Sequence, residues 1–255
     1  MVKIALNIPD CHIPWQDIKA YNIMLTIAKD MNDKIKPIDQ INIMGDFADF
    51  HGVKLHPKMP YEMSLKETLK DEIRQVYLAL EHLRELFPKA DINYIEGNHE
   101  QRLQRYLVQK APELFEFVTL PELFKFDTLR IQYYPYGRGQ LVQCLDTDYH
   151  LRHAPYNAGK HTAASTAHNK GISLGFGHTH RKQSYTFKTA KNQEISCYSM
   201  GWLGDENAPI FNYMDTDNWS KSFQVVYSLN GLPIVHTIDI KNHKAVYNGT
   251  VYGKI

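Results

Sequence analysis

One stretch of the sequence decides the fold: INYIEGNHEQR, residues 92–102. Its first five residues, 92–96, form a short apolar run that is typical of a β-strand, and the run ends at Gly97-Asn98-His99-Glu100. Such a four-residue motif is rare and is expected by chance in well under roughly one chain in a hundred of this size. Because ligands bind at the carboxyl ends of strands in open α/β sheets, the motif indicates a ligand site at the end of this strand.

Two earlier apolar runs end in the same kind of residue. Residues 3–9 lead into Asp10-Cys11-His12, and residues 38–44 lead into Gly45-Asp46. Each of these short motifs is weak when taken alone, since a capped turn at the end of a strand explains it equally well. Their common position after a strand predicts that all of them meet at one edge of a parallel sheet.

The segment between the second and third runs predicts the clearest helix of the chain. Over residues 64–87, apolar residues recur at three- and four-residue steps while charged residues fill the other face. Ser64 followed by Glu67 indicates a capping box at the start of this helix, and Pro88 indicates its end. Other helical segments are expected at residues 18–27, 101–110, 112–117 and 160–169.

The second half of the chain is richer in strands. After about residue 128, short runs of β-branched and aromatic residues follow one another, and Asn230-Gly231 indicates a hairpin turn between the last two. The polar and aromatic stretch 201–220 has weak periodicity, so we expect an ordered loop that covers part of the molecule. The expected strands are residues 130–134, 141–145, 149–153, 172–176, 184–188, 195–200, 222–229 and 233–240.

Composition limits the class of protein. With 255 residues, of which 43% are hydrophobic, the chain can bury a full core, and we predict one domain over residues 1–255. The net charge of +1 gives no global basic field, although a local basic patch remains possible. Neither a secretory leader nor an apolar run near the roughly 18 residues of a membrane span is present in the sequence. Three distant cysteines, Cys11, Cys144 and Cys197, argue against a disulfide framework, so we expect a soluble, cytoplasmic protein without a membrane partner.

Two histidine motifs complete the set of polar strand ends. Gly177-His178-Thr179-His180 follows the expected strand at residues 172–176, and His153 ends the strand at residues 149–153. His150 is the alternative to His153, but in a strand it would point to the opposite face. Together the motifs supply the carboxylate, amide and imidazole groups that borderline divalent metals prefer. Enough ligands are present for two metal ions, which indicates hydrolysis of a phosphate ester.

The motifs, in this order, resemble those of the calcineurin-like metallophosphoesterase family. The resemblance covers residues 10–180, and it is nearest to compact phage and bacterial members because of Gly97-Asn98-His99-Glu100-Gln101-Arg102 and the segment 45–51, GDFADFH. It implies an α/β fold in four layers, an α-β-β-α sandwich of two mixed β-sheets flanked by helices. It also implies a dimetal site at the carboxyl ends of the strands.

The resemblance further assigns the ligands of two divalent metal ions. The bridge between the metals would be Asp46, and a water shared by two such cations becomes a hydroxide that attacks phosphorus in line. Mn²⁺ is the first expectation, with Fe²⁺, Zn²⁺, Ni²⁺ or Mg²⁺ as alternatives. One metal would take Asp10, His12 and His180, and the other would take Asn98, His153 and His178.

The residues around these ligands are expected to act on the substrate. In the family the histidine equivalent to His99 contacts the phosphate and protonates the leaving oxygen, and Glu100 would orient that imidazole and raise its pKa. Arg102 and Asn98 are the predicted substrate-binding residues. Asp49 is expected near the outer layer of the site.

Several functions fit this pattern. The first expectation is a phosphodiesterase that acts on nucleic acid or a nucleotide, since the resemblance is to phage and repair-type members. A phosphomonoesterase, either a nucleotidase or a protein phosphatase, is the alternative within enzymes. A catalytically inactive binding scaffold on the same fold is the alternative outside them.

Overall fold

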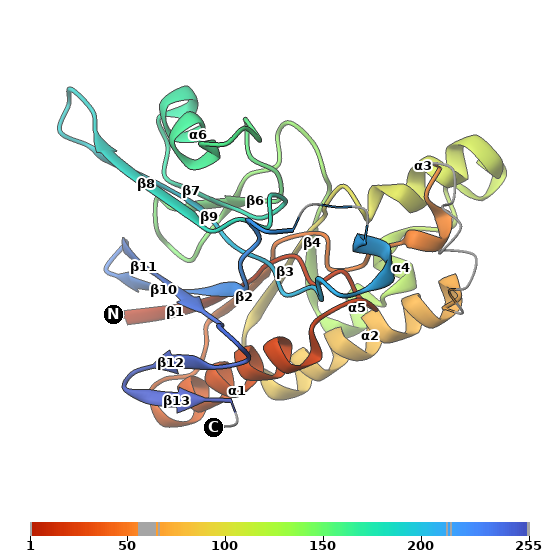
Figure 1. The fold of residues 1–255 in the computed structure, drawn as a ribbon, viewed down its shortest axis with the longest axis horizontal. Helices are drawn as coiled ribbons and strands as arrows, with labels where there is room; N and C mark the ends of the chain where they lie inside the picture. Colours follow the sequence, from red (N-terminus) through yellow and green to blue (C-terminus); the bar gives the residue numbers. More distant parts are fainter. Residues whose placement is uncertain (1, 56–64, 66, 213, 215, 254–255) are drawn as a thin grey trace.

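Two stacked β-sheets form the centre of the molecule in the computed structural model, which describes residues 2–55, 65, 67–212, 214 and 216–253 (Figure 1). The first sheet has the order β11-β10-β1-β2-β3-β4, in which β1 to β4 run parallel and β10 and β11 pair antiparallel at one side. Its strands are β1 (Val2–Ile8), β2 (Gln40–Ile43), β3 (Asp91–Ile95), β4 (Ile131–Tyr134), β10 (Ser222–Leu229) and β11 (Leu232–Asp239).

The second sheet has the order β5-β6-β7-β9-β8 and is also mixed. Strands β6, β7 and β9 run parallel, while β5 and β8 pair antiparallel at the two edges. Its strands are β5 (Val142–Gln143), β6 (His150–Arg152), β7 (Leu174–Phe176), β8 (Gln183–Lys188) and β9 (Glu194–Ser199), and a separate hairpin is formed by β12 (Ala245–Tyr247) and β13 (Thr250–Tyr252).

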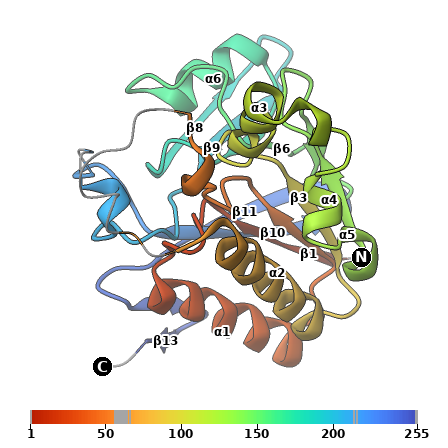
Figure 2. The ribbon, with the colours of Figure 1, turned by 90° about the vertical axis from the view of Figure 1, so that its right-hand side faces the viewer.

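Helices cover the outer faces of both sheets. Figure 2 shows α1 and α2 side by side beneath the first sheet, and α6 covers the second sheet on the opposite side of the molecule. The α-helices are α1 (Ile18–Lys34), α2 (Leu69–Leu86), α3 (Gln101–Lys110), α4 (Leu120–Leu123), α5 (Phe126–Leu129) and α6 (Thr162–Lys170), with 3₁₀ turns η1 (His51–Val53), η3 (Pro112–Leu114) and η4 (Pro209–Phe211). The result is the predicted α-β-β-α sandwich.

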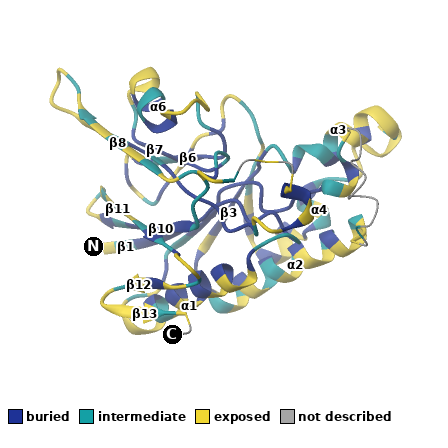
Figure 3. Cartoon of the chain, in the orientation of Figure 1, coloured by how far each residue is buried: buried dark blue, intermediate teal, exposed yellow. Residues whose placement is uncertain are grey.

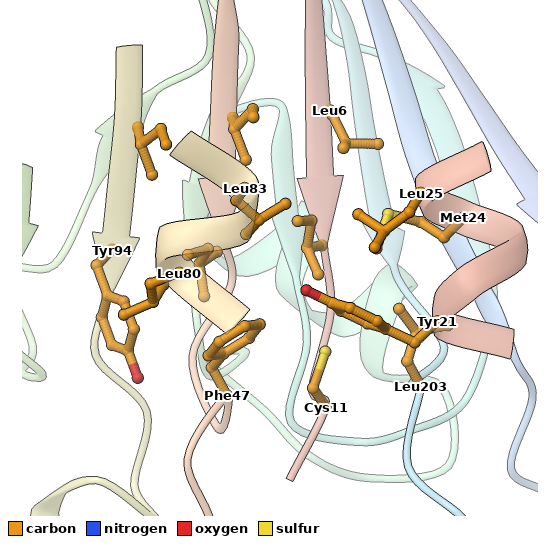
Figure 4. Close-up of a cluster of buried hydrophobic side chains, with 14 of the residues drawn as sticks. Leu6, Cys11, Tyr21, Met24, Leu25, Phe47, Leu80, Leu83, Tyr94 and Leu203 are labelled. Carbon is orange, nitrogen blue, oxygen red and sulfur yellow. The ribbon is translucent and has the colours of Figure 1, made fainter. Parts of the chain in front are cut away.

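The layers are held by separate apolar clusters, because successive side chains of a strand point to opposite faces. In β1, Ile4, Leu6 and Ile8 pack against α1 and α2, whereas Ala5 packs between the two sheets with residues such as Leu151. Figure 4 shows the first of these clusters, and Figure 3 shows that central strands such as β1, β3 and β10 are mostly buried, whereas β8, β12 and β13 are largely exposed.

Between the sheets, amide side chains replace apolar ones at one level of the parallel strands. Asn7, Asn42 and Asn93 are in register on β1, β2 and β3. The amide of Asn93 donates to Asn42 Oδ1 and the amide of Asn42 donates to Asn7 Oδ1, each at 2.8 Å. Because each of these buried amides has a partner, the ladder fixes the strand register without a large desolvation cost.

The structure corrects one predicted helix boundary. Helix α2 begins at Leu69, where the side chain of Thr68 and that of Asp71 form a capping box. The predicted capping residue Ser64 lies outside the described residues, and Glu67 precedes the helix. The apolar periodicity of residues 64–87 therefore overestimated the length of the helix, whereas the predicted hairpin at Asn230-Gly231 is confirmed by the pairing of β10 with β11.

The segment 112–117, expected to be helical, forms only the 3₁₀ turn η3 at its start. Within the part of the chain that the structure describes, no helix is long and apolar enough to cross a bilayer.

Candidate metal centre

The polar strand-end motifs of both sheets converge in the structure. The residues that follow β1, β2 and β3 in the first sheet meet those that follow β6 and β7 in the second. Non-glycine residues with positive φ are sparsely populated and tend to cluster at functional sites. Four of the predicted ligands have this backbone: His12 (φ 53), Asp46 (φ 46), His178 (φ 65) and His180 (φ 56).

A first group of donors consists of Asp10, His12 and His180, whose ligand atoms all lie within 4.8 Å of one another. All three residues are buried. The Nε2 atoms of His12 and His180 face each other at 3.0 Å, and Nδ1 of His180 has no hydrogen-bond partner among the described residues. Two imidazole nitrogens directed at one point beside a carboxylate fit a divalent cation.

A second group consists of Asp46, His153 and His178, again with ligand atoms within 4.8 Å of one another. The amide oxygen of Asn98 lies 3.0 Å from His153 Nε2 and 2.7 Å from His178 Nδ1, so Asn98 joins this group. The ring of His150, the alternative considered for this position, instead contacts the carbonyl of Asp148 at 3.0 Å. The structure thus places His153 in the site and His150 outside it.

Asp46 lies between the two groups. Its carboxylate oxygen Oδ1 is 3.3 Å from His153 Nε2 in the second group. Asp46 also forms a cluster with His12, a member of the first group, and with His99. A carboxylate shared in this way has the position of a bridging ligand between two cations.

Two glycines of the motifs are required by close approach to these carboxylates. A Cβ atom on Gly97 would collide with Asp46 Oδ1 and with the backbone nitrogen of Asp46, and a Cβ atom on Gly177 would collide with Asp10 Oδ2. The lack of a side chain at Gly177 also lets His178 N–H donate to both oxygens of Asp10, at 3.0 and 3.1 Å. The absence of a side chain at these two glycines therefore leaves room for the carboxylates of Asp46 and Asp10 to lie directly against the backbone.

The electrostatics of the protein alone favour neutral imidazoles at most ligand positions. Burial lowers the pKa of His178 to about 4 and lowers the pKa of His12 and His180 as well. Burial also lowers the pKa of His153, but the charge of Asp46 outweighs it and raises that pKa to about 10. Metal ligation requires deprotonated nitrogens, so the neutral histidines present lone pairs as a cation requires.

Hydrogen bonds behind two of these histidines fix the orientation of their rings. Nδ1 of His12 lies 2.9 Å from Asp49 Oδ2, and Nδ1 of His153 lies 2.8 Å from the carbonyl oxygen of Met44. Each acceptor takes the Nδ1 proton, so that Nε2, once deprotonated as ligation requires, directs its lone pair into the site, the arrangement typical of metal-ligating histidines. The donor set and its supporting hydrogen bonds fit two divalent cations.

His99 lies beside this donor set without being one of its predicted ligands. Its Nδ1 is 3.0 Å from Asp49 Oδ2, and its Nε2 is 3.0 Å from Nη2 of Arg102 and 3.8 Å from Asp46 Oδ2. Burial lowers its pKa, but the charges of Asp46 and Asp49 together raise it. His99 also lines a hollow of about 410 Å³ together with Asn98 and His178, so its ring can reach a ligand in that hollow.

The prediction that Glu100 orients His99 is wrong in this structure. Glu100 is buried at the start of α3 and points beneath the site. Its two oxygens accept hydrogen bonds from four backbone N–H groups and one hydroxyl: those of Asp46, Phe47, Ala48 and Gly97, and the Tyr94 hydroxyl. Glu100 therefore organises the loop that carries Asp46, and it does not pair with the imidazole.

Asp49, rather than Glu100, is the carboxylate that contacts the His99 ring. Besides His12 and His99, it accepts a hydrogen bond from Nη1 of Arg102 at 2.8 Å, and these contacts hold its pKa well below the usual value despite its burial. Arg102, predicted to bind substrate, thus lies at the site, where its guanidinium also forms hydrogen bonds with Asp49 and His99. The sequence feature that could have indicated this contact is Asp49 itself, which lies three residues after Asp46 in the segment 45–51.

Changing Asp49 to asparagine should therefore reduce activity while the fold is kept. Because one carboxylate orients both a metal-binding histidine and His99, we expect turnover to fall about 10- to 100-fold. The measurement is kcat on a phosphate ester with metal content determined in parallel. The exposed Asp148→Asn variant is the control, and an unchanged kcat in Asp49→Asn would contradict the role of Asp49.

Comparisons with known proteins give relatives in both sequence and structure. No family model matches the chain. It is 26% identical over 237 residues to the Gene 54 protein of Mycobacterium phage L5, covering 89% of this chain and 89% of the phage protein. Vacuolar Protein Sorting 29 from Cryptosporidium parvum superposes with a TM-score of 0.51 at 13% identity, covering 99% of both chains. A predicted phosphoesterase from Streptococcus pneumoniae superposes with a TM-score of 0.40 at 13% identity, covering 98% of this chain and 96% of that one.

The chain shares the fold of Vacuolar Protein Sorting 29. The superposition on Vacuolar Protein Sorting 29 extends over nearly the whole chain, and both share the two mixed sheets flanked by helices. The fold predicted from the motifs is thereby confirmed. At this level of identity the likeness concerns the fold, and function has to be argued from the site.

Proposed function

We propose that this protein is a dinuclear-metal-dependent phosphoesterase of the calcineurin-like family that hydrolyses a phosphodiester of a nucleic acid or nucleotide. One observation carries the proposal: two histidine–carboxylate groups meet at Asp46, and His99 stands beside them. Two cations at roughly 3.5–4 Å are the usual requirement for in-line displacement at phosphorus. The first metal would be held by Asp10, His12 and His180, the second by Asn98, His153 and His178, and Asp46 would hold both.

When bound, the two cations acidify an attacking water and offset the charge of the phosphate oxygens. The remaining chemistry belongs to His99 and its neighbours. Asp46 and Asp49 raise the pKa of His99 and so favour its protonated form, which can deliver a proton to the leaving oxygen. The guanidinium of Arg102 lies 3.0 Å from His99 Nε2 and donates to that nitrogen while the ring is neutral. When the ring is protonated both groups are donors, and a phosphate oxygen is their natural acceptor.

Two observations bear on the alternatives. One structural neighbour, Vacuolar Protein Sorting 29, is named for vacuolar protein sorting, so this fold by itself does not imply hydrolysis. The complete donor set and the strained backbone at His12, Asp46 and His178 favour an enzyme over a binding scaffold. Mn²⁺ is our first proposal for the metal, because a mixture of carboxylate, amide and imidazole donors suits it.

The test is hydrolysis of a chromogenic phosphodiester beside its monoester, on chelator-stripped protein with Mn²⁺ added back. We expect turnover to depend on the metal and to be faster on the diester. Faster cleavage of the monoester would replace the diesterase by a nucleotidase or protein phosphatase. Inactivity on both substrates, with metal bound, would favour the binding scaffold.

A further inference from the structure

A second hollow adjoins the hollow at the candidate metal centre. The one at the metal centre has a volume of about 410 Å³, and the neighbouring one has a volume of about 580 Å³. Arg181 and Asn218 line both, so the two hollows adjoin, and we call them together the groove. The second hollow lies between the start of β8 and the chain that leads into α6, the region at the top of Figure 1.

Cationic side chains line the second hollow. Among the residues that the structure describes, the charged ones lining it are Lys160, Arg181 and Lys182, and none of the lining residues is a carboxylate. Lys182 pairs with Asp239 at 2.5 Å. In the described part of the chain, no carboxylate lies within ion-pair distance of Lys160 or Arg181. The protein thus has the local basic patch that its near-zero net charge leaves possible, and the patch leads away from the metal centre.

Aromatic rings lie along the same groove. Trp219 is half-buried and lines the hollow at the metal centre, where its ring packs at 4.3 Å from that of His180. Tyr185 is half-buried and lines the second hollow on β8. Cations that follow a phosphate backbone, interleaved with aromatic rings on which bases stack, are the general features of a single-strand binding groove.

We propose that this groove binds a single-stranded polynucleotide whose phosphates beyond the scissile one lie along Arg181 and Lys160. The inference rests on the proposed function for the position of the scissile phosphate. The groove itself is a separate property of the surface. A mononucleotide or a phosphorylated side chain at the metal centre would leave Lys160, which lines only the second hollow, without a partner anion.

The first experiment measures binding without turnover. Fluorescence anisotropy of a labelled single-stranded oligonucleotide, DNA and RNA in separate arms, is recorded on chelator-treated full-length protein. The Lys160→Gln/Arg181→Gln variant should bind about tenfold more weakly, given two- to fivefold for each exposed ion pair. It should also reduce the slope of log affinity against log salt by about 1.4, since each single-strand phosphate contact contributes about 0.7.

A matched control uses lysines outside the groove. Lys188 and Lys191 lie at the far end of the β8–β9 hairpin, are exposed and do not line the groove, so Lys188→Gln/Lys191→Gln removes two positive charges at a distance. Its affinity should stay near that of the parent protein. Lys160→Gln alone keeps the hydrogen bond from Arg181 to the carbonyl of Ala158. It should lower the logarithm of the oligonucleotide affinity by about half as much as the double variant does.

Hydrolysis separates the two proposals. With Mn²⁺ present, the ratio of kcat/KM on the oligonucleotide to that on a small chromogenic diester should fall in the groove variant and not in the control. Equal losses in the two variants, or competition by inorganic polyphosphate as strong as that by oligonucleotide, would overturn the nucleic-acid groove. Absence of hydrolysis with intact, groove-dependent binding would overturn the proposed enzyme and leave the groove standing.

Discussion

Replacing Asp46 with asparagine is expected to lower turnover by more than about a thousandfold, since it removes the one charge that both cations would share. Asparagine keeps the shape of aspartate and retains an oxygen that can accept the hydrogen bond from His99 N–H, which Asp46 Oδ1 accepts at 2.9 Å. The loss should therefore come from charge rather than from misfolding. Metal content measured by mass spectrometry should fall in parallel, from about two ions per chain to one or none.

The chain provides its own control for this substitution. Gly204-Asp205 repeats the dipeptide Gly45-Asp46, but Asp205 Oδ1 only closes a turn by accepting from Asn207 N–H at 2.9 Å. Asp205→Asn should leave kcat and metal content unchanged. Retained turnover in Asp46→Asn, with both metals bound, would contradict the two-metal mechanism.

Replacing His99 with alanine is expected to have the second-largest effect. A proton delivered to the leaving oxygen contributes about 10²- to 10⁴-fold, so kcat should fall by that range. Metal content should stay near that of the parent protein, because the two donor groups assigned to the metals do not require His99. The loss should also be larger for a diester with an alkyl leaving group than for a nitrophenyl one, which leaves without a proton.

This dependence on the leaving group separates general acid catalysis from a structural role. His82 is a suitable control, because its side chain is 52% exposed on α2 and does not line the hollow at the metal centre. His82→Ala should change neither kcat nor the leaving-group dependence. If His99→Ala instead loses metal, then His99 is a ligand and the assignment of the second donor group has to be revised.

The position of the site follows from the architecture of the parallel strands. Strands β1, β2 and β3 lie side by side with the same direction, so the residues after Ile8, Ile43 and Ile95 must meet at one edge. This much was predictable from the sequence, because an apolar run followed by Asp, Gly-Asp or Gly-Asn-His is a local pattern. His153 and the pair His178 and His180 come from a different sheet, and only the stacking of the two sheets brings them to the same edge.

Backbone geometry at two turns decides features that sequence patterns do not reveal. The family resemblance predicts that Glu100 orients His99, but the turn at the start of α3 directs the carboxylate toward the backbone N–H groups of residues 46–48. The start of α2 was placed too early because apolar spacing says nothing about where the backbone first adopts helical geometry. That point is decided by the cap at Thr68, which the pattern of residues 64–87 did not distinguish from Ser64.

The sequence by itself determined the donor chemistry and the parallel strands that present it, because both are properties of short, local patterns. Only the tertiary structure decided that Asp49 orients His99, since that choice depends on how the loop after β2 folds over the turn after β3. It also decided that Lys160 and Arg181, in a chain with a net charge of +1, line one groove beside the metal centre. Spatial proximity between residues far apart in the chain arises from packing, and packing depends on contacts among several segments at once.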